Sequence, residues 1–498
     1  MLRLRVQPLL LVPLAWALHC LAPGSARGNG AFPDAQSILA PAERDGEISL
    51  ATNFGLVSTT DGGATWIWAC ELPDSNNGFL YQVGAAPARR LYALSPPLGS
   101  NDSRLVFSDD RACGWQAAGG RLGGTVVLDA FPDPTAAARV LAIASTGGTA
   151  GAVAHALYES RDGGATFTET LYSAPAGDLL TGVEIARSDP RTIYLTVSSG
   201  AQFLPRLLRS TDGGAHFATI DLQPSLGGTS VRLIAVDPDR PERVFLRASG
   251  AEQDQLAVAV VDAMGGVSVR VVLTATAGRL AAFARLPSKT ILTAGALGAD
   301  LAPALFRSTD GGDTFQPVPG APHLRALAGR GTQVFGAADF QQDNYALGVS
   351  TDDGLTWRAL MRFDQVAAIK GCISAACQLS CQTQVDNNLW PLAMCGARDT
   401  TTAAGPDGGA APAPPPGSTG GGGCQIGGRA RRGVALGALL LLAALALRRT
   451  RSLSQNRHAN VAARAWAARH NRDWTSLESE SCSTSTPCDP ASWSNPKG

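Results

Sequence analysis

The sequence has very little lysine and no excess of either charge. Lysine occurs three times in 498 residues, at Lys289, Lys370 and Lys497. The 41 positive and 41 negative side chains cancel, so no basic surface predicts nucleic-acid binding. The preference for arginine over lysine is typical of coding bias in GC-rich genomes and indicates no particular ligand.

Several motifs of common hydrolases and metal sites are also missing. The chain has no Gly-x-Ser-x-Gly segment and no His-Glu-x-x-His segment, which excludes the familiar serine hydrolase and zinc peptidase motifs. Its ten cysteines include no Cys-x-x-Cys pair with a nearby histidine, so disulfides are favoured over zinc. We therefore expect no metal, no cofactor and no recognisable catalytic residue.

The sequence does contain a turn that recurs along its first three quarters. Its form is Ser-x-Asp-x-Gly-x-Thr-aromatic, as in residues 308–315, and its copies lie about 50 residues apart with one double interval. The second copy is worn and has Ala112 at the glycine position. The turn aspartates are Asp61, Asp110, Asp162, Asp212, Asp310 and Asp352. A weaker copy at Asp262, followed by Gly265 and Gly266, fills the double interval and gives seven units.

The residue types in this turn have a mechanical explanation. An aspartate at the start of a tight turn accepts hydrogen bonds from backbone N–H groups just ahead of it. The glycines permit positive φ, and the threonine and aromatic residue begin a strand with a large ring in the core. Each turn offers one carboxylate, whereas a calcium loop needs several at alternating positions, so the turns are interpreted as structural. A unit of about 50 residues accommodates four strands, as in a propeller blade.

These turns resemble the Asp-box (BNR) repeats of sialidases, sortilin-like receptors, xyloglucanases and photosystem II assembly factor propellers. The resemblance covers about residues 32–370. It implies an all-β, seven-bladed β-propeller, assigned to residues 29–371, with the turns on its rim as fold elements away from the ligand face.

Segments between the turns suggest a place for a ligand. Residues 182–194 and 231–245 each read as a strand, an Asp-Pro turn and a second strand. Aligning them on the Asp-Pro pair makes Glu184 and Arg232 equivalent, and both are expected to line the central channel from the innermost strands. Asp129 lies on another expected inner strand. A polar ligand could bind between these charges; the alternative is a solvated ion pair lining a wet channel.

The cysteines of the propeller and of residues 372–398 indicate an oxidising compartment. Cys70 follows the first turn and Cys113 lies inside the second, and we expect these two to form a disulfide between adjacent blades. Four more form a cluster after the last turn, and their spacing leaves all three pairings open. They are Cys372, Cys377, Cys381 and Cys395.

The two ends of the chain read as export and anchoring signals. Residues 1–28 have a basic start, an apolar stretch and small residues, as in a secretory signal peptide. Residues 399–428 form a Pro/Gly-rich linker, and the apolar residues 433–447 within the segment 429–451 are expected to form one transmembrane helix. The tail 452–498 is expected to be disordered.

The order of a Gly-rich tether, Cys424, an apolar helix and an arginine cluster resembles the MYXO-CTERM sorting signal of myxobacterial surface proteins. The resemblance implies processing near Cys424 and display on the cell surface. The tail after residue 451 departs from that family, whose signal ends the protein.

These features favour a membrane-anchored surface module that binds a carbohydrate or protein ligand. The alternative is a secreted glycoside hydrolase, sialidase-like or xyloglucanase-like. A sialidase would need an arginine triad and a tyrosine–glutamate pair, but Phe32-Pro33-Asp34 stands where its Arg-Ile-Pro segment is expected, and the chain has six tyrosines. A xyloglucanase pairs two propellers, and this chain has residues for one.

Overall fold

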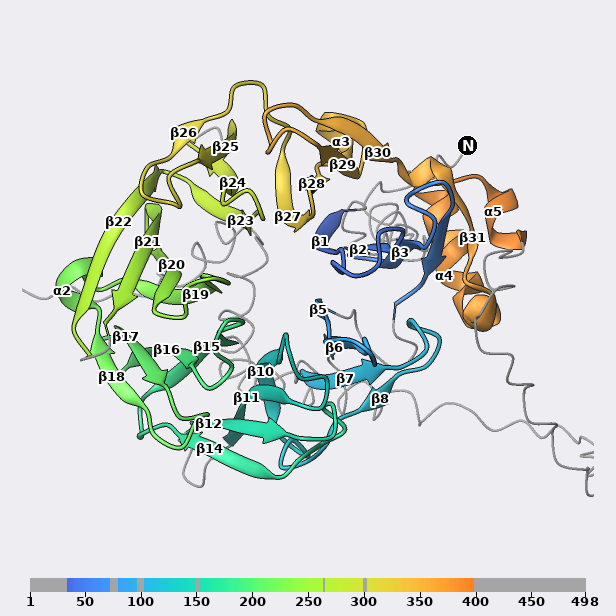
Figure 1. Cartoon of the computed structure of the whole chain (residues 1–498). Helices are drawn as coiled ribbons and strands as arrows, with labels where there is room; N and C mark the ends of the chain where they lie inside the picture. Colours follow the sequence, from blue (N-terminus) through green and yellow to red (C-terminus); the bar gives the residue numbers. More distant parts are fainter. Residues whose placement is uncertain are drawn as a thin grey trace, which may run out of the picture.

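The computed structural model describes residues 34–71, 79–95, 103–147, 153–262, 265–298 and 302–397. These residues form seven antiparallel blades of four strands each, arranged in a ring (Figure 1). The predicted all-β, seven-bladed propeller is confirmed. Within each blade the strands follow chain order from the centre of the ring to its rim.

The strands of the first four blades are as follows. Blade 1 contains β1 (Ala35–Leu39), β2 (Ile48–Thr52), β3 (Gly55–Thr59) and β4 (Trp66–Ala69); blade 2 contains β5 (Phe79–Val83), β6 (Leu91–Ser95), β7 (Arg104–Ser108) and β8 (Gln116–Ala117). Blade 3 contains β10 (Val126–Pro132), β11 (Val140–Gly147), β12 (Val153–Ser160) and β14 (Glu169–Ser173); blade 4 contains β15 (Leu179–Ile185), β16 (Ile193–Ser199), β17 (Leu204–Ser210) and β18 (Ala218–Asp221). Between blades 2 and 3, β9 (Gly119–Gly120) pairs in parallel with β13 (Thr166–Phe167).

The remaining blades and the short helices complete the ring. Blade 5 contains β19 (Ser230–Val236), β20 (Arg243–Ser249), β21 (Gln253–Val261) and β22 (Val267–Thr276); blade 6 contains β23 (Arg279–Arg285), β24 (Ile291–Leu297), β25 (Ala302–Ser308) and β26 (Gln316–Pro317). Blade 7 contains β27 (Leu324–Arg330), β28 (Gln333–Ala338), β29 (Leu347–Ser350) and β30 (Arg358–Met361). The helices α2 (Gln223–Leu226) and α3 (Phe340–Asp343) lie in connections.

The hydrophobic core is divided among the interfaces between neighbouring blades. Between blades 4 and 5, for example, Tyr194 and Leu207 of blade 4 join the same buried cluster as Val231 and Leu246 of blade 5. Similar clusters fill the other junctions around the ring. Because apolar side chains on both faces of a blade are buried against its neighbours, removing one blade would expose two interfaces to water.

Each Ser/Thr-x-Asp turn is closed by its own side chains at the third-to-fourth-strand connection of a blade. In blade 6 the Ser308 hydroxyl donates to Asp310 Oδ1 (2.7 Å), which also accepts the backbone N–H of Thr314 (3.0 Å). Ser308 Oγ in turn accepts the N–H of Gly312 (2.8 Å). The same contacts recur at Asp61, Asp110, Asp162, Asp212 and Asp352. In the worn second copy, Ala112 occupies the glycine position with φ of 71°, so the contacts are kept without the glycine.

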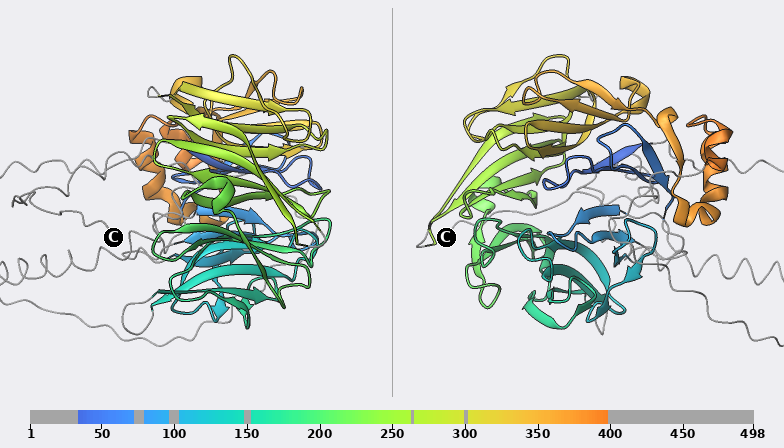
Figure 2. Two further views of the ribbon diagram at one scale, coloured as in Figure 1. Left: turned by 90° about the vertical axis from the view of Figure 1, so that its left-hand side faces the viewer. Right: turned by 45° about the vertical axis from the view of Figure 1, so that its right-hand side comes forward.

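The end of the described chain returns to the first two blades. We call this segment the clasp: β31 (Val366–Ile369), η4 (Gly371–Ile373), α4 (Ser374–Asp386) and α5 (Leu392–Gly396). Strand β31 pairs in parallel with the outer strand β4 of blade 1, and the 3-10 helix η3 (Phe363–Gln365) leads into it from blade 7. Figures 1 and 2 show the two helices of the clasp on the outside of the ring.

All six cysteines proposed for disulfides form them, but the expected Cys70–Cys113 pairing is wrong. Cys70 bonds to Cys377, Cys113 bonds to Cys372, and Cys381 bonds to Cys395. The expectation failed because strand β31 runs beside blade 1 and places the start of the clasp next to both rim cysteines. Two of the disulfides therefore join the clasp covalently to blades 1 and 2.

The expected signal peptide, tether, Cys424 and apolar residues 433–447 lie outside the described residues. Within the described ranges, no helix is long and apolar enough to cross a membrane.

Candidate functional site

A cavity of about 200 Å³ lies on the inner wall where blades 4, 5 and 6 meet. Its polar side chains are Glu184, Arg232, Arg247 and Thr293. Its apolar wall is formed by Leu233, Ile234, Leu280, Ala281, Ala282 and Phe283. The cavity thus combines charge, a hydroxyl and an aromatic ring, which are typical features of a small-molecule site.

Glu184 and Arg232 both line this cavity from innermost strands, but they are not equivalent in position. Glu184 lies opposite Tyr194, one residue from the hairpin end of its strand, whereas Arg232 lies opposite Arg247, further along the neighbouring blade. The alignment on the Asp-Pro turn failed because β15 and β19 carry their bulges at different distances from that turn. A bulge shifts the register of every residue beyond it.

The two carboxylates suggested by the sequence are bound to the backbone of the next blade. Glu184 Oε2 accepts the N–H of Val236 in blade 5 (2.9 Å). In blade 3, Asp129 is 2% exposed, and its Oδ2 accepts the N–H of Val183 in blade 4 (3.0 Å). An amide N–H bound in this way favours the ionised carboxylate and fixes it in place. These carboxylates therefore hold consecutive inner strands together.

The arginines of the cavity make similar contacts with carbonyl groups. Arg232 Nη1 donates to the carbonyl of Thr181 in blade 4 (3.4 Å), and Arg247 Nη1 donates to that of Leu280 in blade 6 (2.6 Å). The fully buried Asp254 accepts the N–H of Leu280 (2.9 Å), and one of its oxygens lies 3.8 Å from Arg247 Nε. Charged groups thus line the wall in fixed orientations, which suits the recognition of a polar ligand without a conformational change.

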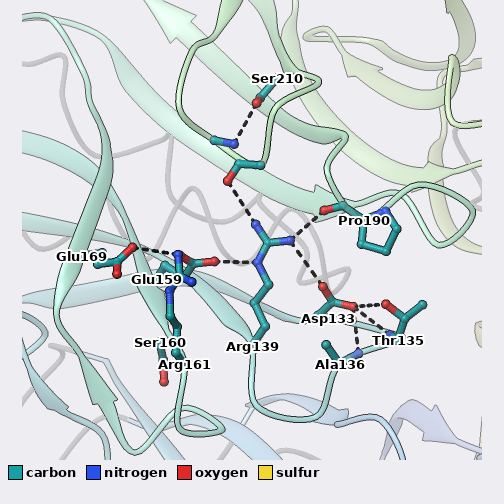
Figure 3. A network of polar contacts seen from close by, with 12 residues as sticks. Asp133, Thr135, Ala136, Arg139, Glu159, Ser160, Arg161, Glu169, Pro190 and Ser210 are labelled. Carbon is teal, nitrogen blue, oxygen red and sulfur yellow. Dashed lines mark hydrogen bonds and ion pairs between the residues drawn. The ribbon is translucent and has the colours of Figure 1, made fainter.

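A second cavity, of about 460 Å³, lies between blades 3 and 4 on the side of the Ser-x-Asp turns. At its base, Arg139 donates to Glu159 Oε1 (2.6 Å) and to the carbonyls of Pro190 (2.7 Å) and Gly213 (3.2 Å) (Figure 3). Glu159 is 3% exposed and also pairs with the exposed Arg161 (2.9 Å). Since Gly213 belongs to the turn of Asp212, this network fastens one blade to the turn of the next.

Arginines that precede the second strand of a blade repeat this contact elsewhere. Arg90 Nη1 donates to the carbonyl of Gly163 (2.8 Å), and Arg243 Nη2 donates to Asp313 Oδ1 (3.2 Å), both in the turn of the following blade. The sequence reasoning missed these residues. The signal was present, because Arg90, Arg139 and Arg243 each stand directly before an apolar strand or begin it.

The electrostatics of the turns agree with a structural role. The hydroxyl and N–H of Thr356, together with the Ser350 hydroxyl, lower the pKa of Asp352 to about 2. Hydrogen bonds from Thr314 and Ser308 likewise lower the pKa of Asp310. Each carboxylate is held by groups of its own turn. Among the described residues, no cluster of three or more histidine, cysteine, aspartate or glutamate side chains could hold a metal ion.

No family model matches the sequence, and no curated protein matches it. The fold is similar to that of the GH74 xyloglucanase from Xanthomonas campestris, with 16% identity, a TM-score of 0.50, and coverage of 69% of this chain and 57% of that one. A GH74 enzyme from Niastella koreensis gives 16% identity, a TM-score of 0.46, and coverage of 67% and 55%. YCF48 from Cyanidioschyzon merolae gives 14% identity, a TM-score of 0.40, and coverage of 62% and 94%.

The chain thus spans little more than half the length of the two GH74 proteins. At such identities the similarity shows the propeller fold alone, because one fold carries many unrelated functions. The described residues form a seven-bladed β-propeller whose structural neighbours include glycoside hydrolases.

Proposed function

We propose that this protein is a binding module of the cell surface, which takes a polar ligand, in the first instance a carbohydrate, in the inner-wall cavity. One observation supports this most directly. The two carboxylates that the sequence placed on inner strands, Glu184 and Asp129, each accept a backbone N–H of the neighbouring blade. They are part of the joint between blades.

Glycoside hydrolysis needs two carboxyl groups on opposite sides of the scissile bond, one of them able to give up a proton. Among the described residues that line the cavity, only Glu184 has a carboxylate side chain. A carboxylate that accepts an amide N–H is a weak proton donor, because the hydrogen bond favours its ionised form. This arrangement supports binding over turnover.

The chemistry of the wall suits a sugar. Arg232, Arg247 and Glu184 offer donors and acceptors for hydroxyl groups, and the partly buried ring of Phe283 offers an apolar surface. Phe283 is itself supported by Phe245, with 5.0 Å between the ring centroids. A cavity of about 200 Å³ would hold one sugar unit or one polar side chain of a protein.

Surface display is supported by separate features. Three disulfides among the described residues are typical of an exported protein. The clasp ends at Gly396, and the Pro/Gly-rich residues 399–428 and apolar residues 433–447 follow it in the sequence. We propose that these residues tether the propeller to a membrane.

The test compares binding and turnover on the full chain. A glycan array and a fluorogenic glycoside panel are probed with the wild type, with Phe283→Ala and with Phe217→Ala. Phe217 is a matched control, since it is also partly buried and packs on Tyr172 (5.4 Å between ring centroids), but it does not line the cavity.

We expect binding without turnover, and we expect Phe283→Ala to weaken binding about tenfold while Phe217→Ala leaves it unchanged. Equal loss in both variants would contradict the cavity as the binding site. Turnover in the wild type that disappears in Glu184→Gln would refute the binding proposal in favour of a glycoside hydrolase. If the wild type neither binds the glycan array nor cleaves any glycoside of the panel, a carbohydrate ligand is excluded. A protein ligand would then be sought by pull-down.

A further inference from the structure

One histidine of the propeller is buried between two blades. His155 is the third residue of β12 in blade 3 and is 8% exposed. Its ring Nδ1 accepts the backbone N–H of Leu180 (3.2 Å), the second residue of β15 in blade 4. This hydrogen bond therefore joins the third strand of one blade to the innermost strand of the next.

An aspartate makes the same kind of contact between blades 5 and 6. Asp254 lies near the start of β21, the third strand of blade 5, and its Oδ2 accepts the N–H of Leu280 (2.9 Å), the second residue of β23. In both innermost strands a bulge follows directly, between Leu180 and Gly182 and between Leu280 and Ala282. A bulge disrupts the hydrogen bonds of the strand ladder, and here a side chain of the preceding blade supplies an acceptor beside it. The two joints are built alike, but one uses a carboxylate and the other an imidazole.

The two acceptors respond differently to acid. A ring nitrogen accepts an N–H only while it carries no proton, so His155 holds its single proton on Nε2 in this contact. A second proton would set a ring N–H against the N–H of Leu180 and would place a charge in a buried site. Burial accordingly lowers the pKa of His155 below its ordinary 6.5. A carboxyl group such as that of Asp254 keeps an acceptor oxygen in either protonation state.

The charged groups on the elements around His155 have partners of their own. Asp178, in the connection before β15, accepts the Ser199 hydroxyl (2.5 Å) and lies 3.8 Å from Arg206 Nη1. Strand β11 carries no charged residue. The other ionisable side chains on β10, β12 and β14 to β17 are Asp129, Tyr158, Glu159, Glu169, Tyr172, Glu184, Tyr194 and Arg209. Among the described residues, no carboxylate bonds to the His155 ring, so a proton there would gain no ion pair in this arrangement.

The residue that follows Leu180 contacts an arginine of the inner-wall cavity. Thr181 is the bulged residue of β15, and its carbonyl accepts Arg232 Nη1 (3.4 Å). Its hydroxyl donates to the carbonyl of Val231 (3.1 Å), also in blade 5. Loss of the His155 contact would therefore release the strand directly before the residue that holds Arg232.

We propose that His155 makes the seam between blades 3 and 4 an acid-sensitive joint, in which a proton on the ring breaks the contact with Leu180 and loosens the start of β15. The loosened strand displaces Thr181 and lowers the affinity of the inner-wall cavity for its ligand. This second step rests on the function proposed above, whereas the joint itself does not. The seam between blades 5 and 6, which Asp254 holds, stays closed at the same pH.

The direction of the effect follows from the lowered pKa of His155. A histidine whose pKa is lower in the closed joint than in the open one stabilises the closed joint above about pH 6.5. This contribution is lost as the pH falls toward the pKa of the closed joint. With an ordinary pKa of about 6.5 in the open joint, the open population at about pH 5.5 is about tenfold larger than at neutral pH.

Hydrogen exchange of the full chain in a mild detergent tests the joint. Exchange is measured at about pH 7.5 and about pH 5.5, and the intrinsic rate at each pH is divided out. We expect the protection of the Leu180 amide to fall about tenfold at the lower pH, and that of the Leu280 amide to stay unchanged. This comparison lies within one molecule and needs no variant.

Two variants test the role of the ring. In His155→Asn the amide oxygen can accept the same N–H at either pH, so we expect the fall in protection at Leu180 to disappear. His216→Asn removes a histidine whose side chain is 89% exposed, on the turn of blade 4, and should behave as the wild type. An unchanged Tm at about pH 7.5 shows that each variant folds. If His155→Asn does not fold, the comparison of Leu180 with Leu280 in the wild type still decides.

Three results would overturn the joint. They are equal protection of Leu180 at both pH values, an equal loss at Leu180 and Leu280, and an acid response that persists in His155→Asn. The glycan array, probed at both pH values, tests the second step, and wild-type binding that is as strong at the lower pH would overturn the coupling to the cavity. Absence of binding at either pH would contradict the proposed function, while hydrogen exchange still decides the joint.

Discussion

Opening the covalent link between the clasp and blade 2 should destabilise the whole ring. The change is Cys113→Ser with Cys372→Ser, which removes one of the two disulfides that join the clasp to the blades. Because Cys70–Cys377 remains, the bond that is lost closes a ring of about 50 residues, and the loop-entropy relation gives about 4 kcal/mol for such a ring. Counting the full separation of 259 residues would overstate the effect, since the second disulfide already holds the ends together.

The free energy of unfolding is measured by chemical denaturation of the full chain under non-reducing conditions, with hydrogen exchange following strand β31. Cys381→Ser with Cys395→Ser serves as control, since that bond lies wholly within the clasp. We expect faster exchange in β31 for the first variant and not for the control. An unchanged unfolding free energy and unchanged β31 protection would refute the reasoning. They would show that packing of Trp390 against Trp68, with 4.9 Å between ring centroids, holds the clasp unaided.

Three further predictions concern single side chains. Arg139→Met should lower the unfolding free energy by about 3 kcal/mol in urea titrations, because it removes a partner of the buried Glu159 carboxylate; a change below about 1 kcal/mol would contradict this. Hydrogen bonds from Thr356 hold the pKa of Asp352 at about 2, below its ordinary 3.8. This carboxylate therefore stabilises the fold above about pH 4, and its contribution is lost as the pH falls toward 2. Asp352→Asn should flatten that part of an acid-unfolding curve. Burial raises the pKa of Glu71 from 4.5 to about 7, so its contribution to the stability of the fold is present below about pH 4.5 and lost as the pH rises through 7. Glu71→Gln should therefore raise the Tm at about pH 8 and leave it unchanged at about pH 4. A higher Tm of the variant at about pH 4 would contradict burial as the cause.

The fold could be predicted because one local motif repeats. Each Ser-x-Asp turn contains its own hydrogen-bond partners within seven residues, as at Ser308, Asp310 and Thr314, so the sequence alone specifies it. Seven such turns, counting the weaker copy at Asp262, then determine the number of blades. The disulfide pairing could not be predicted, because it depends on the path of the clasp across blade 1, and no local pattern encodes that path.

The candidate site was predicted less well than the fold. The sequence pointed correctly to inner strands, but the positions of the bulges in β15 and β19 determine which side chains share a cavity. A bulge inserts one extra residue into a strand and hardly changes the amino-acid composition of that strand. The role of Glu184 also depends on Val236, 52 residues later, whose backbone N–H it accepts. Contacts from a side chain to a distant backbone group carry no residue-type signal, so sequence reasoning could not separate a ligand-binding carboxylate from one that joins blades.

The candidate binding cavity and the clasp lie on different sides of the ring. The inner-wall cavity belongs to blades 4–6, which lie across the ring from the clasp (Figure 1). Since disulfides join the clasp to blades 1 and 2, the tether that we propose after Gly396 would pull on the ring from the side away from the proposed binding cavity.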